Sequence, residues 1–378
     1  MSTLVGWLEE RREGMLADLA EFVQRESPTT ERVRVDSFAE FLAGYAEEVS
    51  GGRAEVIRQQ ERGNHVRLQI GGVGERTILM VGHFDTVWPT GTLARMPFRV
   101  TNGRARGPGV FDMKAGLVQG LWALRALRET GCQHPSVVFF FNSDEEVGSP
   151  SSRSLIEEEA RKAAVCLVLE PSFNGALKTA RKGAGIFSVR VTGRAAHAGS
   201  EPFAGVSAIE EACRITLDLH AENNRETGTT VNVGVIHGGT RANVVAADAE
   251  LEVDLRAATE AEGRRMTRLI LGLRPHHGEA RIDVSGGMNR PPMERTAEIA
   301  RLLGHARQLS LELGFDLEEA SVGGGSDGNF CAVVNPAVLD GLGAVGGGAH
   351  ALNEYVLVDH MVPRAALVAR LLETVLEA

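Results

Sequence analysis

The first half of the chain alternates apolar runs with segments of helical spacing. The leucines after residue 112 recur every three to four positions, which predicts a helix with one face in the core. Strands without polar alternation, separated by helices, are typical of a mainly parallel α/β sheet covered by helices on both faces. The expected helices are 4–26, 32–49 and 151–162, and the expected strands are 54–60, 65–71, 77–82, 137–141 and 165–169.

The middle of the chain has a different period. Apolar and polar residues alternate at 187–192, 231–235 and 250–255, as expected of antiparallel strands with one buried face. The order β-α-β-β-α-β is that of a ferredoxin-like unit, so we predict an inserted α+β domain. Its two helices and its last strand are expected at about 205–220, 260–273 and 280–285.

The pattern of the first half returns near residue 293. A helix to about residue 313 is followed by a glycine-rich loop at 323–328, a strand near 337–340 and a final helix from about residue 363. We therefore expect a catalytic domain formed by 1–179 and 289–378, with the inserted domain at 180–288.

Size and charge narrow the function. The chain has 378 residues, with 40 Lys and Arg against 50 Asp and Glu and a net charge of −10. An acidic chain lacks the basic face of a nucleic-acid binder, and no apolar run reaches the ~18 residues of a membrane span. The four cysteines are scattered without a CxxC pair, which indicates reduced thiols rather than disulfides or a thiolate metal site. No signal-peptide pattern opens the chain, so we expect a cytoplasmic protein.

Imidazole and carboxylate groups follow the apolar runs. In an open α/β sheet the site lies beyond the carboxyl ends of the strands, and this ligand mixture is typical of a catalytic zinc site. The groups suit two ions that share Asp112. One ion would take His83 and Glu170, and the other would take Glu146 and His350. We expect two divalent ions per subunit, zinc first, with cobalt or manganese as alternatives because they accept the same ligands.

Two further acids have separate expected roles. Asp85 follows His83 at a spacing of two, so both side chains point the same way, and we interpret Asp85 as the group that holds the imidazole. Glu145 directly precedes Glu146, and we interpret Glu145 as the general base that takes a proton from water and delivers it to the leaving nitrogen. Plainer alternatives are a salt-bridged pair for His83 and Asp85, an N-cap for Asp112 and a solvated turn for the two glutamates.

Seven segments occur in this order along the chain, and the similarity that they mark extends from about residue 8 to 375: GHFDTV, GPGVFDMKAG, NSDEEVGS, LEP, GRAAHAG, GGGSDGNF and GGGAHALNEYV. They resemble the M20 metallopeptidases and, among these, bacterial glutamate carboxypeptidases of the carboxypeptidase G type. The resemblance implies a dinuclear zinc exopeptidase that cleaves the amide bond to a C-terminal amino acid, with glutamate expected. Deacylation of N-acyl amino acids and cleavage of di- or tripeptides are alternatives within the family. It also implies that the inserted domain is a lid that mediates homodimerisation.

The resemblance also assigns residues outside the metal site. His197 matches a lid histidine that reaches the partner subunit's active site and donates a hydrogen bond to the oxyanion, and Asn243 matches a lid residue near the same oxygen. Arg290 matches an arginine that binds the substrate carboxylate. Apart from the resemblance, a chain of net charge −10 needs local cations to bind a carboxylate, so Arg181 is a further candidate, and the backbone at Gly324 is a candidate source of N–H donors. The expected partners are a small peptide or N-acyl amino acid and a second copy of the chain, with no nucleic acid or membrane.

Two interpretations outside this family compete with it. Gly324–Gly328 fits G-x-S-x-G, and Asp340 and His350 follow Ser326 in the order of α/β-hydrolases. However, the stretch between Ser326 and His350 is too short for the usual intervening elements. The second competing interpretation is a catalytically inactive metal-binding dimer. Such a protein would be expected to lack a metal ligand or the general base, but all five ligands and Glu145 are present in this sequence.

Overall fold

The computed structural model describes residues 3–377, which form two compact units. The first unit takes the chain up to Ala180, then Arg295–Ser321 and the chain from Ser326 onward. The second takes Arg181–Glu294 and the short segment Val322–Gly325. The second unit runs past the predicted boundary at residue 288 because Met293 pairs with Arg181 across an antiparallel bridge.

A six-stranded sheet, in the order β1-β2-β6-β3-β7-β14, forms the centre of the first unit. The neighbours β6, β3, β7 and β14 are parallel, whereas β1 and β2 join antiparallel at one edge. The predicted α/β fold with a mainly parallel sheet is therefore confirmed. The strands are β1 (Arg53–Ile57), β2 (His65–Ile70), β3 (Thr77–His83), β6 (Ser136–Asn142), β7 (Val165–Val168) and β14 (Val338–Leu339).

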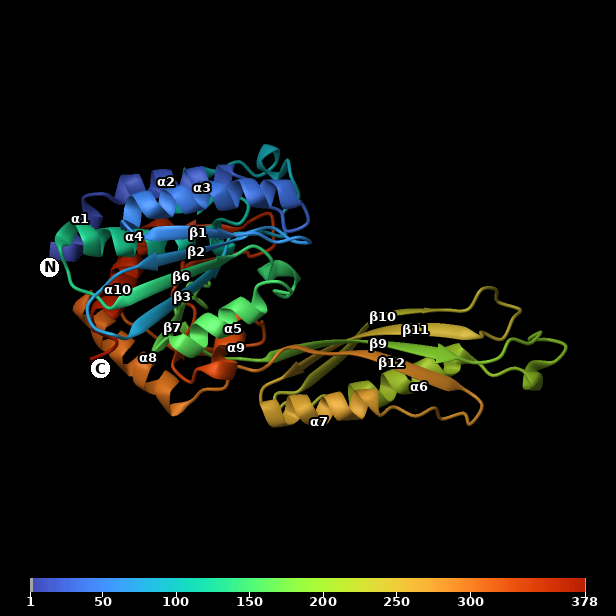
Figure 1. Cartoon of the computed structure of the whole chain (residues 1–378). Helices are drawn as coiled ribbons and strands as arrows, with labels where there is room; N and C mark the ends of the chain where they lie inside the picture. Colours follow the sequence, from blue (N-terminus) through green and yellow to red (C-terminus); the bar gives the residue numbers. More distant parts are fainter. Residues whose placement is uncertain (1–2, 378) are drawn as a thin grey trace. The chain divides into compact units, whose positions relative to one another are not determined.

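Helices cover both faces of this sheet because its strands are apolar on both sides. Ile78 and Met80 of β3 belong to one core with Leu117 of α4, while Leu79 and Val81, which alternate with them, are equally buried. Both α4 and α5 contact β3, and Figure 1 shows α5 in front of the strands. The helices are α1 (Thr3–Glu9), α2 (Arg12–Gln24), α3 (Arg32–Ser50), α4 (Ala115–Thr130), α5 (Arg153–Lys162), α8 (Ala297–Glu312), α9 (Asp327–Val334) and α10 (Met361–Thr374).

The helix predicted at 4–26 is two helices, α1 and α2. The break falls at Glu10 and Arg11, where the Arg11 guanidinium donates to the Trp7 carbonyl at 3.2 Å and so takes an acceptor that lies in the last turn of α1. Across residues 3–377, no helix is both long and apolar enough to pass through a bilayer.

Two small sheets were not predicted. One has the order β15-β16-β5-β4 and the other pairs β13 with β8. β15 and β16 flank residues 348–354, the loop that carries His350, and so fix both ends of that loop. The strands are β4 (Arg99–Thr101), β5 (Arg104–Arg106), β15 (Gly346–Gly347), β16 (Tyr355–Leu357), β8 (Leu177–Arg181) and β13 (Glu319–Val322).

The second unit is an antiparallel sheet with helices on one face. Its order, β10-β11-β9-β12, is that of a ferredoxin-like fold, as predicted. Alternate residues of β9, such as Phe187 and Val189, pack against Ile215 of α6 and Met266 of α7. The elements are β9 (Gly183–Thr192), α6 (Ala208–Ala221), β10 (Thr230–Gly238), β11 (Asp248–Ala257), α7 (Glu260–Leu271) and β12 (Arg281–Arg290).

Candidate metal centre

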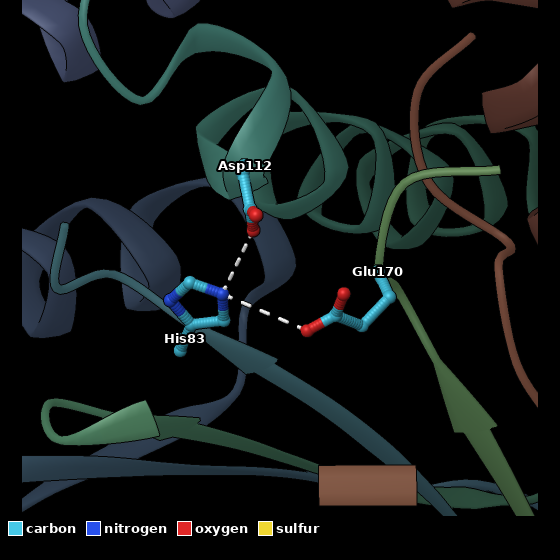
Figure 2. Close-up of side chains that lie close together, drawn as sticks. All are labelled: His83, Asp112 and Glu170. Atoms are coloured by element: carbon cyan, nitrogen blue, oxygen red, sulfur yellow. Dashed lines mark hydrogen bonds and ion pairs between the residues drawn. The ribbon is translucent and has the colours of Figure 1, made fainter. Parts of the chain in front are cut away.

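The carboxyl ends of three parallel strands bring the predicted ligands to one edge of the sheet. His83 ends β3 and pairs in register with Asn142, which ends β6. The turn after β6 is a short 3-10 helix, η3 (Glu145–Val147), and Glu170 lies two residues beyond the end of β7. Figure 2 shows Glu170 and the Asp112 carboxylate directed toward the same nitrogen of His83.

Five side chains form two groups that share Asp112. In the first group, His83 Nε2 lies 3.1 Å from Asp112 Oδ1 and 3.6 Å from Glu170 Oε1. In the second, His350 Nε2 lies 3.4 Å from Asp112 Oδ2 and 3.2 Å from Glu146 Oε2. Within each group, one ligand atom per residue lies within 4.8 Å of the others, a spacing that could hold a metal ion. Because each Asp112 oxygen faces a different histidine, the carboxylate is oriented to bridge two ions.

The backbone around Asp112 explains this orientation. The residue lies in a single π-helical turn, η2 (Val110–Lys114), but its own backbone, at φ −116° and ψ 95°, is not helical. The N-cap position of α4 is held by Lys114 and that of η2 by Gly109, so Asp112 caps neither helix. Its carboxylate faces the two histidines instead of the backbone N–H groups of a helix.

His83 presents its Nε2 atom because its other ring nitrogen is engaged. His83 Nδ1 lies 3.0 Å from the Asp85 carbonyl oxygen, which can only accept, so Nδ1 carries a proton and Nε2 is the nitrogen available to an ion. The sequence interpretation assigned this task to the Asp85 carboxylate. That carboxylate also lies beside the ring, with Oδ1 3.4 Å from Nδ1, and it accepts the backbone N–H groups of Glu145 and Glu146 at 3.2 Å each. Asp85 thus fixes the turn that carries both glutamates.

The charges in this cluster favour a cation. Burial lowers the pKa of His83, but hydrogen bonds to Asp112 and Asp85 and the charge of Glu145 outweigh it and raise that pKa well above its ordinary value. Hydrogen bonds to Asp112 and Glu146 raise the pKa of His350 to about 10. Carboxylates that hold protons on two imidazoles produce the negative field that also attracts a divalent ion.

Glu146 carries a further sign of an ion. Its side chain is 7% exposed, and its Oε1 atom is buried without a hydrogen-bond partner among the described residues. Burial, together with repulsion from Asp112, raises the pKa of Glu146. A buried carboxylate oxygen without a partner is costly, and a metal ion at this position would satisfy it.

The four other predicted residues all belong to the second unit. His197 and Asn243 lie together, because His197 pairs with Val244 across a bridge and the Ala198 N–H donates to the Asn243 carbonyl at 3.0 Å. Arg290 ends β12 and is buried, and Gly324 lies in the short segment of this unit. The five candidate ligands, called the metal group below, lie in the first unit. These four residues therefore belong to a different unit from the metal group.

Two further residues that the sequence analysis considered make contacts with the chain itself. Arg181, a candidate cation for substrate, is buried and donates to the carbonyl oxygens of Gly324 and Gly325 at 3.1 and 3.3 Å, so it holds the glycine-rich loop. Ser326 is buried at the N-cap of α9 and donates to Asp340 at 2.7 Å. A capping serine in this position does not form the nucleophile of an α/β-hydrolase.

Sequence reasoning missed Lys178, a buried lysine on β8 whose Nζ lies 4.0 Å from Glu170 Oε2. Its ammonium group offsets part of the negative charge that Glu170 adds to the cluster. Lys178 lies between Leu177 and Thr179, which are also buried. This five-residue strand therefore has no alternation of polar and apolar residues that would distinguish the lysine.

Comparison with known proteins agrees with this geometry. The model of Peptidase family M20/M25/M40 matches residues 79–374. The chain belongs to this family. Carboxypeptidase G2 of Pseudomonas sp. (strain RS-16) is 32% identical over 317 residues, which cover 82% of this chain and 76% of that protein. Succinyl-diaminopimelate desuccinylase of Acinetobacter baylyi is 29% identical over 326 residues, or 81% of this chain and 85% of that protein.

Solved structures have the same fold. The aminopeptidase PepT of Bacillus cereus superposes with a TM-score of 0.80 at 22% identity, and the match covers 96% of this chain and 98% of that one. The family match and the similarity to carboxypeptidase G2 show that the protein is a hydrolase of the M20 peptidase family. Its relatives include a carboxypeptidase, a desuccinylase and an aminopeptidase by name, so membership in the family leaves the substrate to be determined.

Proposed function

We propose that this M20 hydrolase is a dinuclear metallo-carboxypeptidase that releases a C-terminal amino acid from a peptide or N-acyl substrate. Glutamate is the amino acid that we expect it to release fastest. The observation that carries the proposal is the pair of ligand groups joined by the two oxygens of Asp112. The donor set contains only imidazole and carboxylate, which suits zinc in a catalytic site, with cobalt or manganese as alternatives.

The proposed ligands are His83, Asp112 and Glu170 for one ion and Asp112, Glu146 and His350 for the other. Two divalent ions held in this way supply polarisation of the substrate carbonyl and a lowered pKa of water. The chain orients them through Asp85, whose carbonyl sets the His83 tautomer.

Glu145 is the proposed general base. It is half-buried beside Glu146, and its charge contributes to the raised pKa of His83, so its carboxylate lies close to the ligand cluster. In the reaction, a Glu145 carboxylate oxygen takes a proton from water as the water oxygen attacks the amide carbon. The same proton then passes to the amide nitrogen as the C–N bond breaks, which leaves Glu145 ionised again.

His197 is the proposed donor to the oxyanion, acting on the partner subunit's site. Its Nδ1 accepts from the backbone N–H groups of Gly199 and Ser200 at 3.1 and 3.0 Å. An Nδ1 atom that accepts leaves the proton on Nε2, so the exposed imidazole carries an N–H donor even when it is neutral. We propose Asn243, which lies beside it, as a second donor near the same oxygen.

Arg290 and the backbone at Gly324 are the groups that we propose to bind the α-carboxylate of the substrate. A guanidinium binds a carboxylate through two parallel hydrogen bonds, which suits the α-carboxylate that every carboxypeptidase substrate carries. Similarity to carboxypeptidase G2 favours glutamate as the released residue. Similarity to succinyl-diaminopimelate desuccinylase favours the second candidate, an N-acyl amino acid deacylase.

The proposed homodimer uses the edge of the second unit. β10 is an edge strand of its sheet, and the exposed apolar residues Val235 and Ile236 lie on it. The neighbouring helix α6 adds Ile209 and Leu217, the latter 72% exposed. An unpaired edge beside apolar side chains is suited to pairing with a second copy.

The test of function is a product assay on the zinc-loaded protein. N-acyl-glutamate, N-acyl-aspartate and N-acyl-alanine are compared with the same compounds bearing a carboxamide in place of the α-carboxylate, and liquid chromatography measures the amino acid released. We expect N-acyl-glutamate to be cleaved fastest and its carboxamide about 10²-fold more slowly, because the carboxamide leaves the cation without its partner. Equal cleavage of both forms would rule out a carboxypeptidase.

The dimer has a separate test. Leu217→Glu is compared with Leu271→Glu, because Leu271 lies on α7 and is 46% exposed. Light scattering should give a dimer for the wild type and for Leu271→Glu, and a monomer for Leu217→Glu. A dimer that persists in Leu217→Glu would exclude this surface of α6.

A further inference from the structure

One buried carboxylate beside the metal group is bound only by N–H donors in its hydrogen bonds. Glu354 is fully buried, and its Oε1 atom accepts from the backbone N–H groups of Phe111 and Asp112 at 2.8 and 3.1 Å. Its Oε2 atom accepts from the Gly109 N–H at 3.0 Å and from the Trp88 indole N–H at 2.8 Å. Four donors therefore meet the four acceptor positions of one carboxylate.

This arrangement needs an acceptor of this shape. Each of the four partners is an N–H group, so a side chain with donors of its own would leave some of them unpaired. The glycine-rich turn before α4 therefore depends on Glu354 for three of its backbone hydrogen bonds.

Glu354 also belongs to the loop that carries His350. The Glu354 N–H donates to the Ala351 carbonyl at 2.9 Å, and the Ala351 N–H donates to the Gly348 carbonyl at 3.0 Å, so successive turns connect the two residues. His350 itself has φ 61°, a left-handed conformation that is uncommon outside glycine and that the surrounding loop has to hold.

We propose that Glu354 is a positioning residue that ties the Asp112 turn to the His350 loop and so fixes the geometry of the second ion. The proposal rests on the proposed function, since it assumes that the two groups hold metal. Glu354 belongs to neither group of candidate ligands, and it acts through the backbone of Asp112 and through the loop that it shares with His350.

The proposal predicts an unequal effect on the two ions. Two of the three ligands of the second group, Asp112 and His350, lie on the segments that Glu354 joins. In the first group only Asp112 does, because His83 and Glu170 follow β3 and β7. Removal of the Glu354 carboxylate should therefore weaken one ion more than the other, whereas a general loss of stability would weaken both alike.

The main variant is Glu354→Gln, which keeps the size of the side chain but turns an amide N–H₂ toward two of the donors. Cobalt titration of the full-length, ion-free protein, followed by visible absorption, measures the two affinities separately. We expect one affinity to fall about 10–100-fold, the usual cost of losing a group that orients a metal ligand, with a smaller change in the other.

The matched control is Asp18→Asn. Asp18 is also a carboxylate that accepts an indole N–H, from Trp122 at 2.8 Å, together with the Tyr45 hydroxyl, but it lies on α2 and not in the metal group. This variant should lose thermal stability and keep both cobalt affinities. If Asp18→Asn and Glu354→Gln change the cobalt titration alike, Glu354 is structural only.

Trp88→Phe serves if Glu354→Gln does not fold. It removes one donor and leaves the carboxylate with its three backbone partners. We therefore expect the affinity for the second ion, the one held by Asp112, Glu146 and His350, to fall several-fold. Wild-type affinities in a folded Glu354→Gln, or in Trp88→Phe where the former does not fold, overturn the proposal. A wild-type protein that binds fewer than two cobalt ions would instead overturn the proposed function, so the two failures are distinguishable.

Discussion

The metal site of the first unit and the exposed turn at His197 and Asn243 in the second unit carry their expected functional residues in opposite ways. In the first unit the candidate ligands are mostly buried and touch one another: His83 is 1% exposed, and its Nε2 lies within 3.6 Å of two carboxylates. In the second unit, His197 and Asn243 are exposed, and their contacts are to the backbone of their own turn. The candidate ligands of the first unit thus contact one another, whereas His197 and Asn243 face outward.

This difference separates two kinds of inference. A metal group assembled inside one folded unit is testable by its internal geometry, since costly features such as the unpaired Glu146 oxygen already require an explanation. A donor such as His197 has no such internal requirement, because its function depends on what approaches it. Experiments on the first unit should therefore measure metal and rate, and experiments on the second should measure assembly and substrate.

The largest effect is expected from Glu145→Gln in the first unit. The carboxylate that accepts the proton is lost while the proposed ligands remain, so kcat should fall about 10³-fold with both ions retained. Activity assays and metal analysis of the same preparation check this. Glu146→Gln is the matched variant, and it should lose one ion. If Glu145→Gln loses the ion and Glu146→Gln keeps both, the assignments of the two glutamates are reversed.

The next effect tests the second unit. His197→Ala should lower kcat about 10²-fold without changing the metal content, because one donor to the oxyanion is lost. Mixing this protein with Glu145→Ala, with subunit exchange, then tests whether His197 acts across the dimer. A mixed dimer would hold one site with both Glu145 and His197 intact, so about a quarter of wild-type activity should return after random pairing. No recovery after verified exchange would mean that His197 acts within its own chain or not at all.

A smaller effect is expected at the substrate carboxylate. Arg290→Lys keeps the charge but loses the planar pair of donors, so KM for an N-acyl-glutamate should rise about 10-fold with a lesser change in kcat. Arg281→Lys, at the exposed start of the same strand β12, is the matched control and should leave KM unchanged. An unchanged KM in Arg290→Lys would remove Arg290 from substrate binding.

The fold was predictable where a pattern extends over enough residues. The apolar runs of β3, β6 and β7 and the alternation of β9 and β11 each cover four residues or more, and both predicted the fold class. β15 and β16 have two and three residues, too few to show a period, and their place is set by pairing with each other and with β5. The break between α1 and α2 likewise depends on a side-chain contact that periodicity does not record.

The candidate site was predictable in its ligands but not in its supports. Each ligand follows a strand or a glycine turn, a position that chain order reveals. Glu354 is one acid in a loop, and its importance arises from Trp88 and the turn before α4, which lie far away in sequence. Asp85 was expected to orient His83 through its carboxylate, which lies 3.4 Å from His83 Nδ1; the sequence did not indicate the closer contact, 3.0 Å to the Asp85 carbonyl, or the two backbone N–H groups that the carboxylate accepts.

The smallest expected effect concerns His65, a buried histidine of the first unit that lies beside Ser143, just before the turn that carries Glu145 and Glu146. His65 Nδ1 lies 3.3 Å from the Ser143 backbone nitrogen and 3.1 Å from the Ser143 hydroxyl, and its Nε2 lies 3.1 Å from the Ser151 hydroxyl. Burial lowers the pKa of His65, and the charges of Asp144, Asp85 and Asp327 only partly offset this.

The sign of the pH dependence follows from that direction. The unfolded chain binds a proton at His65 below about pH 6.5 while the folded chain does not, so the stability that neutral His65 contributes is complete above that pH and is lost as the pH falls. The slope for one proton is at most about 1.4 kcal/mol per pH unit. Urea unfolding of ion-free protein across this range should give a shallower acid decline for His65→Gln than for the wild type. His276→Gln, at a histidine of the second unit whose side chain is 37% exposed, should follow the wild type, and equal slopes in all three proteins would show that His65 does not contribute to the acid sensitivity.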